Sequence, residues 1–98
     1  MDEYEISKIR FEWDDSKALT NLKKHYVTFD EAATIFNDPL TLTYPDPDHS
    51  DNEQRLITIG VSKRDWLLIV NHTDRNEQTR IISARRANNH ERRLYENG

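Results

Sequence analysis

Five short stretches of the chain alternate polar and hydrophobic residues or are rich in β-branched residues, which is typical of β-strands. Only a few polar residues separate the last three stretches from one another, so we expect antiparallel hairpins there. The predicted strands are residues 8–13, 40–44, 55–61, 66–73 and 79–84.

Between the first two predicted strands, hydrophobic residues recur every three or four positions, which indicates helices. The first helix should begin at Asp14 or Asp15, whose carboxylate can accept hydrogen bonds from free backbone N–H groups, and run to about His25. We expect its apolar side to consist of Ala18, Leu22 and Tyr26.

Two segments carry a capping box, in which a polar residue and a glutamate three positions later satisfy each other's backbone N–H groups. Thr28 and Glu31 form the first, and Asn88 and Glu91 resemble a second near the end of the chain. The helix after Thr28 should end at Asp38-Pro39, and its core-facing residues are Phe29, Ala32, Ala33 and Phe36.

The predicted order is one strand, two helices, an antiparallel meander and a C-terminal helix. This is an α+β fold in which helices cover one face of the sheet. A chain of 98 residues is the size of one domain, so we expect a single domain over residues 1–98.

Charge is distributed unevenly along the chain. Residues 1–53 hold five Lys/Arg and thirteen Asp/Glu (net −8), whereas residues 54–98 hold nine and five (net +4). Five arginines fall between residues 80 and 95, and Arg grips phosphate with two parallel hydrogen bonds. The pattern indicates an anionic partner for the second half about as strongly as it indicates a solvated, salt-bridged helix.

The overall composition limits the class of protein. A pI near 5.5 argues against a protein that coats nucleic acid generally, and favours a local anion site. The chain has no cysteine, no hydrophobic run long enough to span a membrane and an acidic N-terminus unlike a signal peptide, so we expect a cytoplasmic protein.

The sequence does not favour a metal or a cofactor. The loop over residues 45–53 contains Asp46, Asp48, His49, Asp51 and Glu53, but its spacing fits no EF-hand. A solvated loop is the more probable interpretation. We predict no metal site and no cofactor.

The turn positions suggest a row of basic residues across the meander. A two-residue turn at Lys63-Arg64 and a turn centred near Asn76 would place Arg55, His72 and Arg80 side by side on one face. A slip of one residue in either turn would move these side chains to opposite faces.

Such a row could perform acid–base chemistry on a phosphate. Two neighbouring guanidinium groups disfavour a protonated imidazole, so His72 would be neutral and able to accept a proton. Arg55 and Arg80 would hold the phosphate and stabilise its developing charge. In the competing interpretation, His72 is a structural strand residue and the arginines pair with the acidic loop.

Taken in chain order, these residues resemble the BrnT family of bacterial toxins. The matching residues are Phe11-Glu12-Trp13-Asp14 with Lys17, Asn21, Lys24 and His25; Val27-Thr28-Phe29 with Glu31-Ala32-Ala33; Phe36 with Asp38-Pro39; Asp46-Pro47-Asp48-His49-Ser50 with Glu53 and Arg55; Ile59-Gly60; His72-Thr73; residues 80–85; and Glu91-Arg92 with Tyr95.

The resemblance implies a RelE-like fold and a ribonuclease that slows translation. It also implies a BrnA-like ribbon-helix-helix antitoxin that blocks the toxin, with operator DNA bound only by the complex. Arg80 and Arg85 fit the basic site of the family. One departure is Tyr26, where the family usually has Gly, so the first helix could end differently here.

From these residues we predict metal-independent RNA cleavage by the 2′-hydroxyl, with His72 as base and Arg55 and Arg80 as phosphate clamps. Arg85 would be a further contact, although strand parity puts it on the face opposite Arg80. The remaining candidates are Tyr95 or His49 as the acid, and His49, Arg86 and Arg92 as substrate contacts.

Two alternatives remain open: a non-catalytic module that seats an antitoxin, and an RNA-binding domain without cleavage. Helices on one side of a sheet leave the other side open, so we also expect an apolar patch for the antitoxin. Its predicted members are Leu56, Leu67, Ile69 and Ile81.

Overall fold

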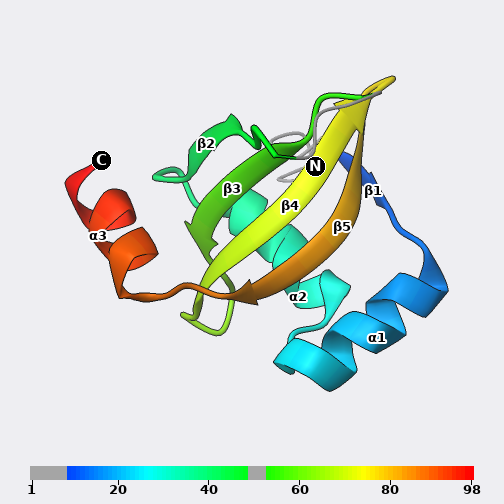
Figure 1. Cartoon of the computed structure of the whole chain (residues 1–98), viewed down its shortest axis with the longest axis horizontal. Helices are drawn as coiled ribbons and strands as arrows, with labels where there is room; N and C mark the ends of the chain where they lie inside the picture. Colours follow the sequence, from blue (N-terminus) through cyan, green and yellow to red (C-terminus); the bar gives the residue numbers. More distant parts are fainter. Residues whose placement is uncertain (1–8, 49–52) are drawn as a thin grey trace, which may run out of the picture.

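The computed structural model describes residues 9–48 and 53–98, and its order of strands and helices agrees with the predicted one (Figure 1). None of the helices in this part of the chain is long and apolar enough to cross a membrane. The elements are β1 (Arg10–Glu12), α1 (Asp15–His25), α2 (Phe29–Thr34), the 3₁₀-helix η2 (Ile35–Asn37), β2 (Leu42–Pro45), β3 (Leu56–Val61), β4 (Leu67–Arg75), β5 (Gln78–Arg86) and α3 (Asn89–Asn97).

The five strands form one sheet in the order β1-β5-β4-β3-β2. The four later strands pair antiparallel as a meander, as predicted. The first strand departs from the prediction of a wholly antiparallel sheet, because β1 pairs parallel to β5, with Glu12 opposite Arg80. No turn joins these two strands, so only the packing of the whole chain fixes their relative direction.

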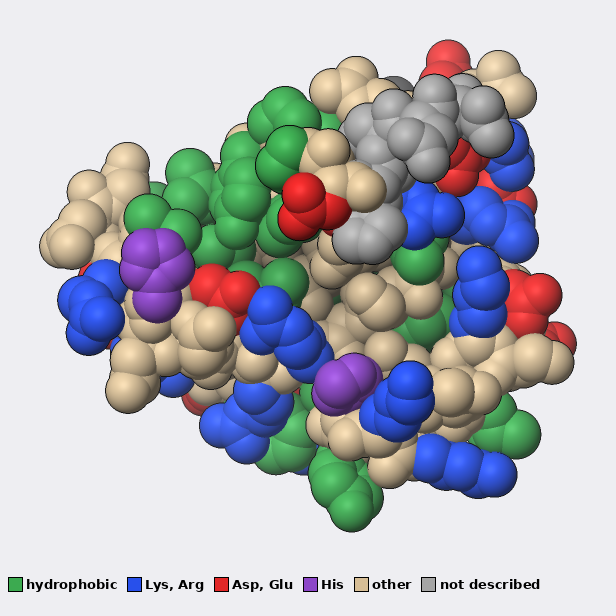
Figure 2. Space-filling view, in the orientation of Figure 1, with side chains coloured by type: hydrophobic (Ala, Val, Ile, Leu, Met, Phe, Trp, Pro, Cys, Tyr) green, Lys and Arg blue, Asp and Glu red, His purple; other side chains and the backbone are tan. Residues whose placement is uncertain are grey.

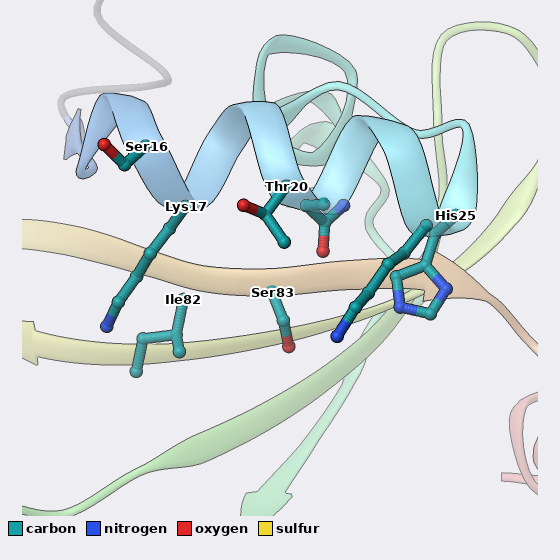
Figure 3. A pocket seen from close by; sticks show the side chains of 8 residues that line it. Ser16, Lys17, Thr20, His25, Ile82 and Ser83 are labelled. Carbon is teal, nitrogen blue, oxygen red and sulfur yellow. The ribbon is translucent and has the colours of Figure 1, made fainter.

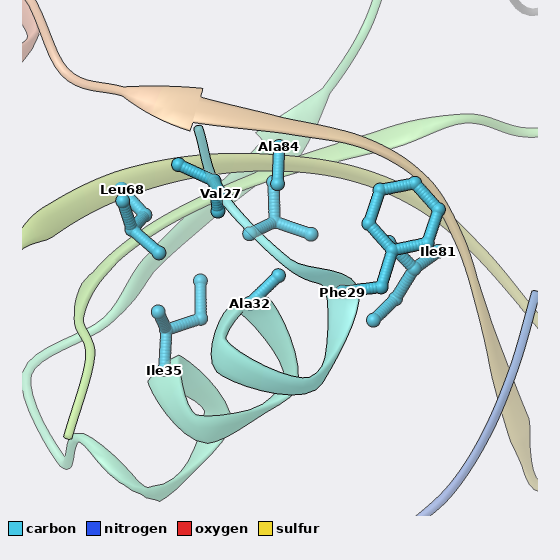
Figure 4. Packing of buried hydrophobic residues seen from close by; sticks show 8 residues of the cluster. Val27, Phe29, Ala32, Ile35, Leu68, Ile81 and Ala84 are labelled. Atoms are coloured by element: carbon cyan, nitrogen blue, oxygen red, sulfur yellow. The ribbon is translucent and has the colours of Figure 1, made fainter. Parts of the chain in front are cut away.

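The main core lies between α2 and one face of the sheet, which we call the helix face. Figure 4 shows Phe29 and Ala32 of α2 and Ile35 of η2 directed toward Leu68 and Ala84 of the strands. The helix spacing predicted from the sequence is thereby confirmed: Phe29 and Ala32 are buried, and Ala33 and Phe36 pack against the same cluster.

The opposite face, which we call the open face, has a second cluster built on Ile59, Leu67 and Ile69. Ala87 and Tyr95, from the last part of the chain, pack against this cluster. The prediction that helices cover only one face is therefore wrong, because Tyr95 belongs to α3. The predicted membership of the exposed apolar patch is also wrong. Leu67 and Ile69 are 5% and 2% exposed, and Ile81 is buried in the main core.

The first helix begins and ends where the sequence predicts, but its buried side differs. Asp14 caps it, and Tyr26 ends it in the left-handed region at φ 59°, donating its N–H to the Leu22 carbonyl. Tyr26 therefore adopts the conformation that glycine usually supplies. Leu22 and Tyr26 are 39% and 77% exposed, so of the predicted apolar stripe only Ala18 packs against the core.

The residue that α1 does bury is Asn21, which completes the outer edge of β5. Its Nδ2 donates to the Ala84 carbonyl at 2.8 Å and to the Val27 carbonyl at 3.1 Å, and its Oδ1 accepts from the Ala84 N–H at 3.0 Å. β1 pairs with β5 only as far as Arg80, so Asn21 supplies hydrogen bonds that a strand would otherwise make. This side chain fixes α1 beside β5.

One of the two predicted capping boxes forms completely. Asn88 and Glu91 each bond the other's backbone N–H at the start of α3. Thr28 caps α2, but the Glu31 side chain is buried and accepts instead from the Ser62 hydroxyl at 2.7 Å. Glu31 thus ties α2 to the turn between β3 and β4.

Candidate functional site

The predicted row of Arg55, His72 and Arg80 is wrong, because both hairpin registers differ by one residue. Leu56, not Arg55, lies opposite His72, and Thr73 lies opposite Arg80. The β3–β4 turn is longer than predicted: the Ser62 N–H donates to the Trp66 carbonyl, and Asp65 takes φ 65°.

His72 lies on the helix face and is 1% exposed. Its Nε2 is 2.7 Å from Thr58 Oγ1, its Nδ1 is 2.9 Å from Asp74 Oδ1, and its ring packs edge-on against Phe36. Burial lowers the pKa of His72, although Asp74 acts in the opposite direction. The ring is therefore a bridge between β3 and β4, shielded from any phosphate on the surface.

A bulge in β5 brings Arg80 and Arg85 to the same face. Asn71 pairs with Ser83 and His72 pairs with Ile81, so one step along β4 matches two steps along β5, with Ile82 as the extra residue. Simple alternation predicted opposite faces for the two arginines. With the bulge, both lie on the open face.

We call the polar residues that share this face the open-face strip. Arg85 lies opposite Ile69 and Arg80 opposite Thr73, four residues farther along β4. At about 3.3 Å per residue, their backbones are roughly 13 Å apart. The two cations therefore follow one line along the sheet rather than converging on one point. The strip consists of Asn71, Thr73, Arg80, Ser83 and Arg85.

Among the described residues, Arg80 makes one long ion pair, whereas Arg85 makes two short hydrogen bonds to a carboxylate. Nη1 of Arg80 is 3.8 Å from Glu12 Oε1, and its side chain is 34% exposed. Arg85 binds Glu91 through two hydrogen bonds of 2.9 and 2.7 Å, which raise the pKa of Arg85 and lower that of Glu91. Arg85 is held in place and partly neutralised, so Arg80 is the cation more available to a ligand.

Arg55 immediately precedes β3, and alternation from Ile57 places it on the open face beside the strip. Its carbonyl accepts a hydrogen bond from the N–H of Asp46 at 2.8 Å. Asp46 is buried, and its carboxylate also accepts from Asn71. The acidic loop is therefore joined to the start of β3 through the backbone of Asp46 and Arg55.

The other predicted site residues are not members of the strip. Tyr95 donates to Asp38 Oδ2 at 2.6 Å, which raises the pKa of Tyr95 to about 12 and fastens α3 to the body of the protein. Arg86 stacks on Trp66 at 4.3 Å, and Arg92 is exposed on α3. His49 lies outside the described residues.

Sequence reasoning missed a basic pocket between α1 and β5. Lys17, Lys24 and His25 line it together with Ser83 of the strip. A signal was present, because positions seven apart, such as Lys17 and Lys24, share one side of a helix.

The open face divides into an apolar part and a basic part. Figure 2 shows hydrophobic side chains gathered over β2 and β3, and Lys and Arg side chains around the lower and right parts of the same face. Among the described residues, no three His, Cys, Asp or Glu side chains come together as a metal site. The basic part suits a polyanion.

The sequence model of the family described as "Ribonuclease toxin, BrnT, of type II toxin-antitoxin system" matches residues 13–91, a range that includes the strip and the basic pocket. The fold is similar to that of the ribonuclease toxin BrnT of Brucella abortus in a crystal structure, with a TM-score of 0.60 and 23% identity, covering 82% of this chain and 97% of that one. No curated protein sequence matches the chain significantly.

Proposed function

Because the chain belongs to the BrnT family of ribonuclease toxins of type II toxin–antitoxin systems, we propose that its open face binds and cleaves RNA. The observation that carries this proposal is the bulge at Ile82, which gives Arg80 and Arg85 a common face. Arg80 is the principal phosphate contact, and Arg85 and Arg55 are further contacts. The uncharged polar residues of the strip lie between the arginines.

The chemistry we propose uses the 2′-hydroxyl of RNA as the nucleophile. This cleavage needs in-line geometry, proton transfer and stabilisation of the negative charge that builds on the phosphate, and it needs no metal. The arginines of the open face supply the charge stabilisation. We assign His72 to holding β3 and β4 together, because both ring nitrogens already have partners inside the protein.

The proposal predicts that purified protein cuts RNA in excess EDTA at the rate seen without the chelator. The physical reason is that guanidinium groups, rather than a divalent cation, neutralise the reacting phosphate. The assay follows a labelled RNA over time. Loss of cutting in EDTA that Mg²⁺ restores would contradict the mechanism, and RNA binding without cutting would support a non-catalytic module.

We further propose the finer features that the family resemblance implies: a RelE-like arrangement, action on translation in the cytoplasm and a BrnA-like ribbon-helix-helix antitoxin. The exposed side of α3 is a suitable surface for that partner. His90, Arg93, Leu94 and Asn97 line a hollow of about 360 Å³ there, and Leu94 is 39% exposed. A segment with acidic and apolar side chains complements this surface.

We expect the protein and its antitoxin to elute as one complex in size-exclusion chromatography, and only the mixture to shift operator DNA. Replacing Leu94 by Asp and Arg93 by Glu should weaken the complex, because the contact loses its apolar anchor and its charge attraction. Lys23→Glu, on α1, is the control. Separate elution of the unmodified proteins, or an operator shift by this protein alone, would refute the partner proposal.

A further inference from the structure

We propose that the basic pocket between α1 and β5 is a second phosphate-binding subsite, which seats the backbone of the RNA that crosses the open face. The inference rests on the proposed function and extends it to a surface outside the arginine strip. The polar and charged residues that line the pocket are Ser16, Lys17, Thr20, Lys24, His25 and Ser83.

The geometry of the pocket suits a phosphate group. Figure 3 shows α1 running along β5, with the Lys17 side chain extending from the helix toward the strand that carries Ile82 and Ser83. Lys24, seven positions later on the same side of the helix, lines the same space. The space has a volume of about 300 Å³. Two ammonium groups and neighbouring hydroxyls offer hydrogen-bond donors from several directions to the oxygens of one phosphate.

The position of the pocket is built into the fold. Asn21, which also borders the pocket, fixes α1 against Ala84 through its hydrogen bonds to that residue's N–H and C=O. Lys17 and Lys24 lie one turn before and about one turn after Asn21 on the same helix. The cations are therefore carried by a helix whose distance from β5 is set by buried hydrogen bonds.

The pocket is continuous with the open-face strip, because Ser83 belongs to both. Ser83 lies opposite Asn71, between the levels of Arg80 and Arg85. A strand of RNA that contacts the arginines can therefore place a neighbouring phosphate between Lys17 and Lys24. No carboxylate is among the described residues that line the pocket.

The lining favours phosphate over a protein partner. Within the described part of its lining, Ile82 is the only apolar residue, whereas the core of a protein–protein interface is usually apolar or aromatic. A second hollow, formed by α1 and the start of α2, has that apolar character, with Trp13, Leu19 and Phe29 in its lining. Nucleic-acid interfaces are more positively charged than protein–protein interfaces, and two lysines line the basic pocket.

The test measures binding to a fully 2′-O-methylated RNA, which keeps the phosphates and lacks the attacking hydroxyl. Lys17→Ala and Lys24→Ala should each weaken binding several-fold and lower the slope of log affinity against log salt by roughly 0.7, the value for one single-strand phosphate contact. Lys23→Ala is the matched control, since it removes the same charge from the same helix at an exposed position outside the pocket.

Thermal unfolding of Lys17→Gln and Lys24→Gln shows whether weaker RNA binding comes from the lost charge or from a disturbed helix. Glutamine removes the charge and keeps part of the aliphatic side chain. The subsite is refuted if the pocket variants match Lys23→Ala in affinity and salt slope. It is also refuted if they bind RNA normally and lose only the antitoxin, because the pocket would then hold acidic side chains.

Failure of this inference is distinguishable from failure of the ribonuclease proposal. If the unmodified protein cleaves RNA and the pocket variants bind the methylated RNA normally, only the subsite is wrong. If the protein binds the methylated RNA in a pocket-dependent way and never cleaves RNA, the subsite stands and the catalytic proposal falls.

Discussion

Arg80→Ala should lower RNA cleavage by about 10²-fold or more while the protein still folds, because a lost contact to the developing charge typically has that effect. Arg80 is the best-placed cation of the open-face strip. Its side chain is 34% exposed, and its one ion pair within the described part of the chain is long, 3.8 Å to Glu12, so its removal breaks no strong ion pair there. Arg80→Lys should restore activity only in part, because an ammonium group cannot make the two-pronged contact.

Arg64→Ala is the matched control for this experiment. Arg64 is also an exposed arginine with one long charge contact, 3.7 Å to Glu31, but it lies over Trp66 in the β3–β4 turn. Rates are measured with purified proteins of equal thermal stability. If Arg80→Ala cleaves RNA as fast as Arg64→Ala does, the assignment of Arg80 is wrong.

Asn21→Ala should lower the free energy of unfolding by about 3 kcal/mol or more. The change leaves the N–H and C=O of Ala84 and the C=O of Val27 without the partner they have now, and each unsatisfied buried group costs about 1–3 kcal/mol. Urea unfolding followed by circular dichroism measures the loss.

Two variants sharpen this second prediction. Asn21→Asp keeps an acceptor for the Ala84 N–H and loses the donor to both carbonyls, so it should also be strongly destabilising. Lys23→Ala, two residues away on an exposed position, should change the stability by less than about 0.5 kcal/mol. A loss below about 1 kcal/mol for Asn21→Ala would show that other contacts hold α1 to β5.

The helices could be predicted from the sequence because their signals are local. Asp14, Thr28 and Asn88 cap helices where expected, and each does so through residues three positions away. The buried side of α1 could not be predicted in this way. It depends on Asn21 reaching Ala84, 63 positions farther along the chain.

The registers of the hairpins were missed for a different reason. Asp65, Asn76 and Glu77 all take positive φ angles that turn rules assign mainly to glycine and asparagine, so the turn lengths were not evident from the residue types. The bulge at Ile82 has no glycine to mark it. The shift between β3 and β4 separates Arg55 from His72, and the shift between β4 and β5 separates His72 from Arg80.

The candidate site was therefore predicted in part. The arginine content of residues 80–95 pointed to the basic region, and Arg80 and Arg85 do share a face. Their common orientation depends on the bulge, and the burial of His72 depends on Thr58 and Phe36, which lie on other elements. The pairing of Arg85 with Glu91 likewise requires α3 to fold back toward β5.

The most direct test of the account compares two RNAs that differ only by a 2′-O-methyl group at the position cleaved by the purified protein. Attack by the 2′-hydroxyl predicts cleavage of the unmodified RNA, with 2′,3′-cyclic phosphate or 3′-phosphate ends, and no cleavage of the methylated RNA at that position. Equal cleavage of both RNAs, or products with 5′-phosphate ends, would contradict it.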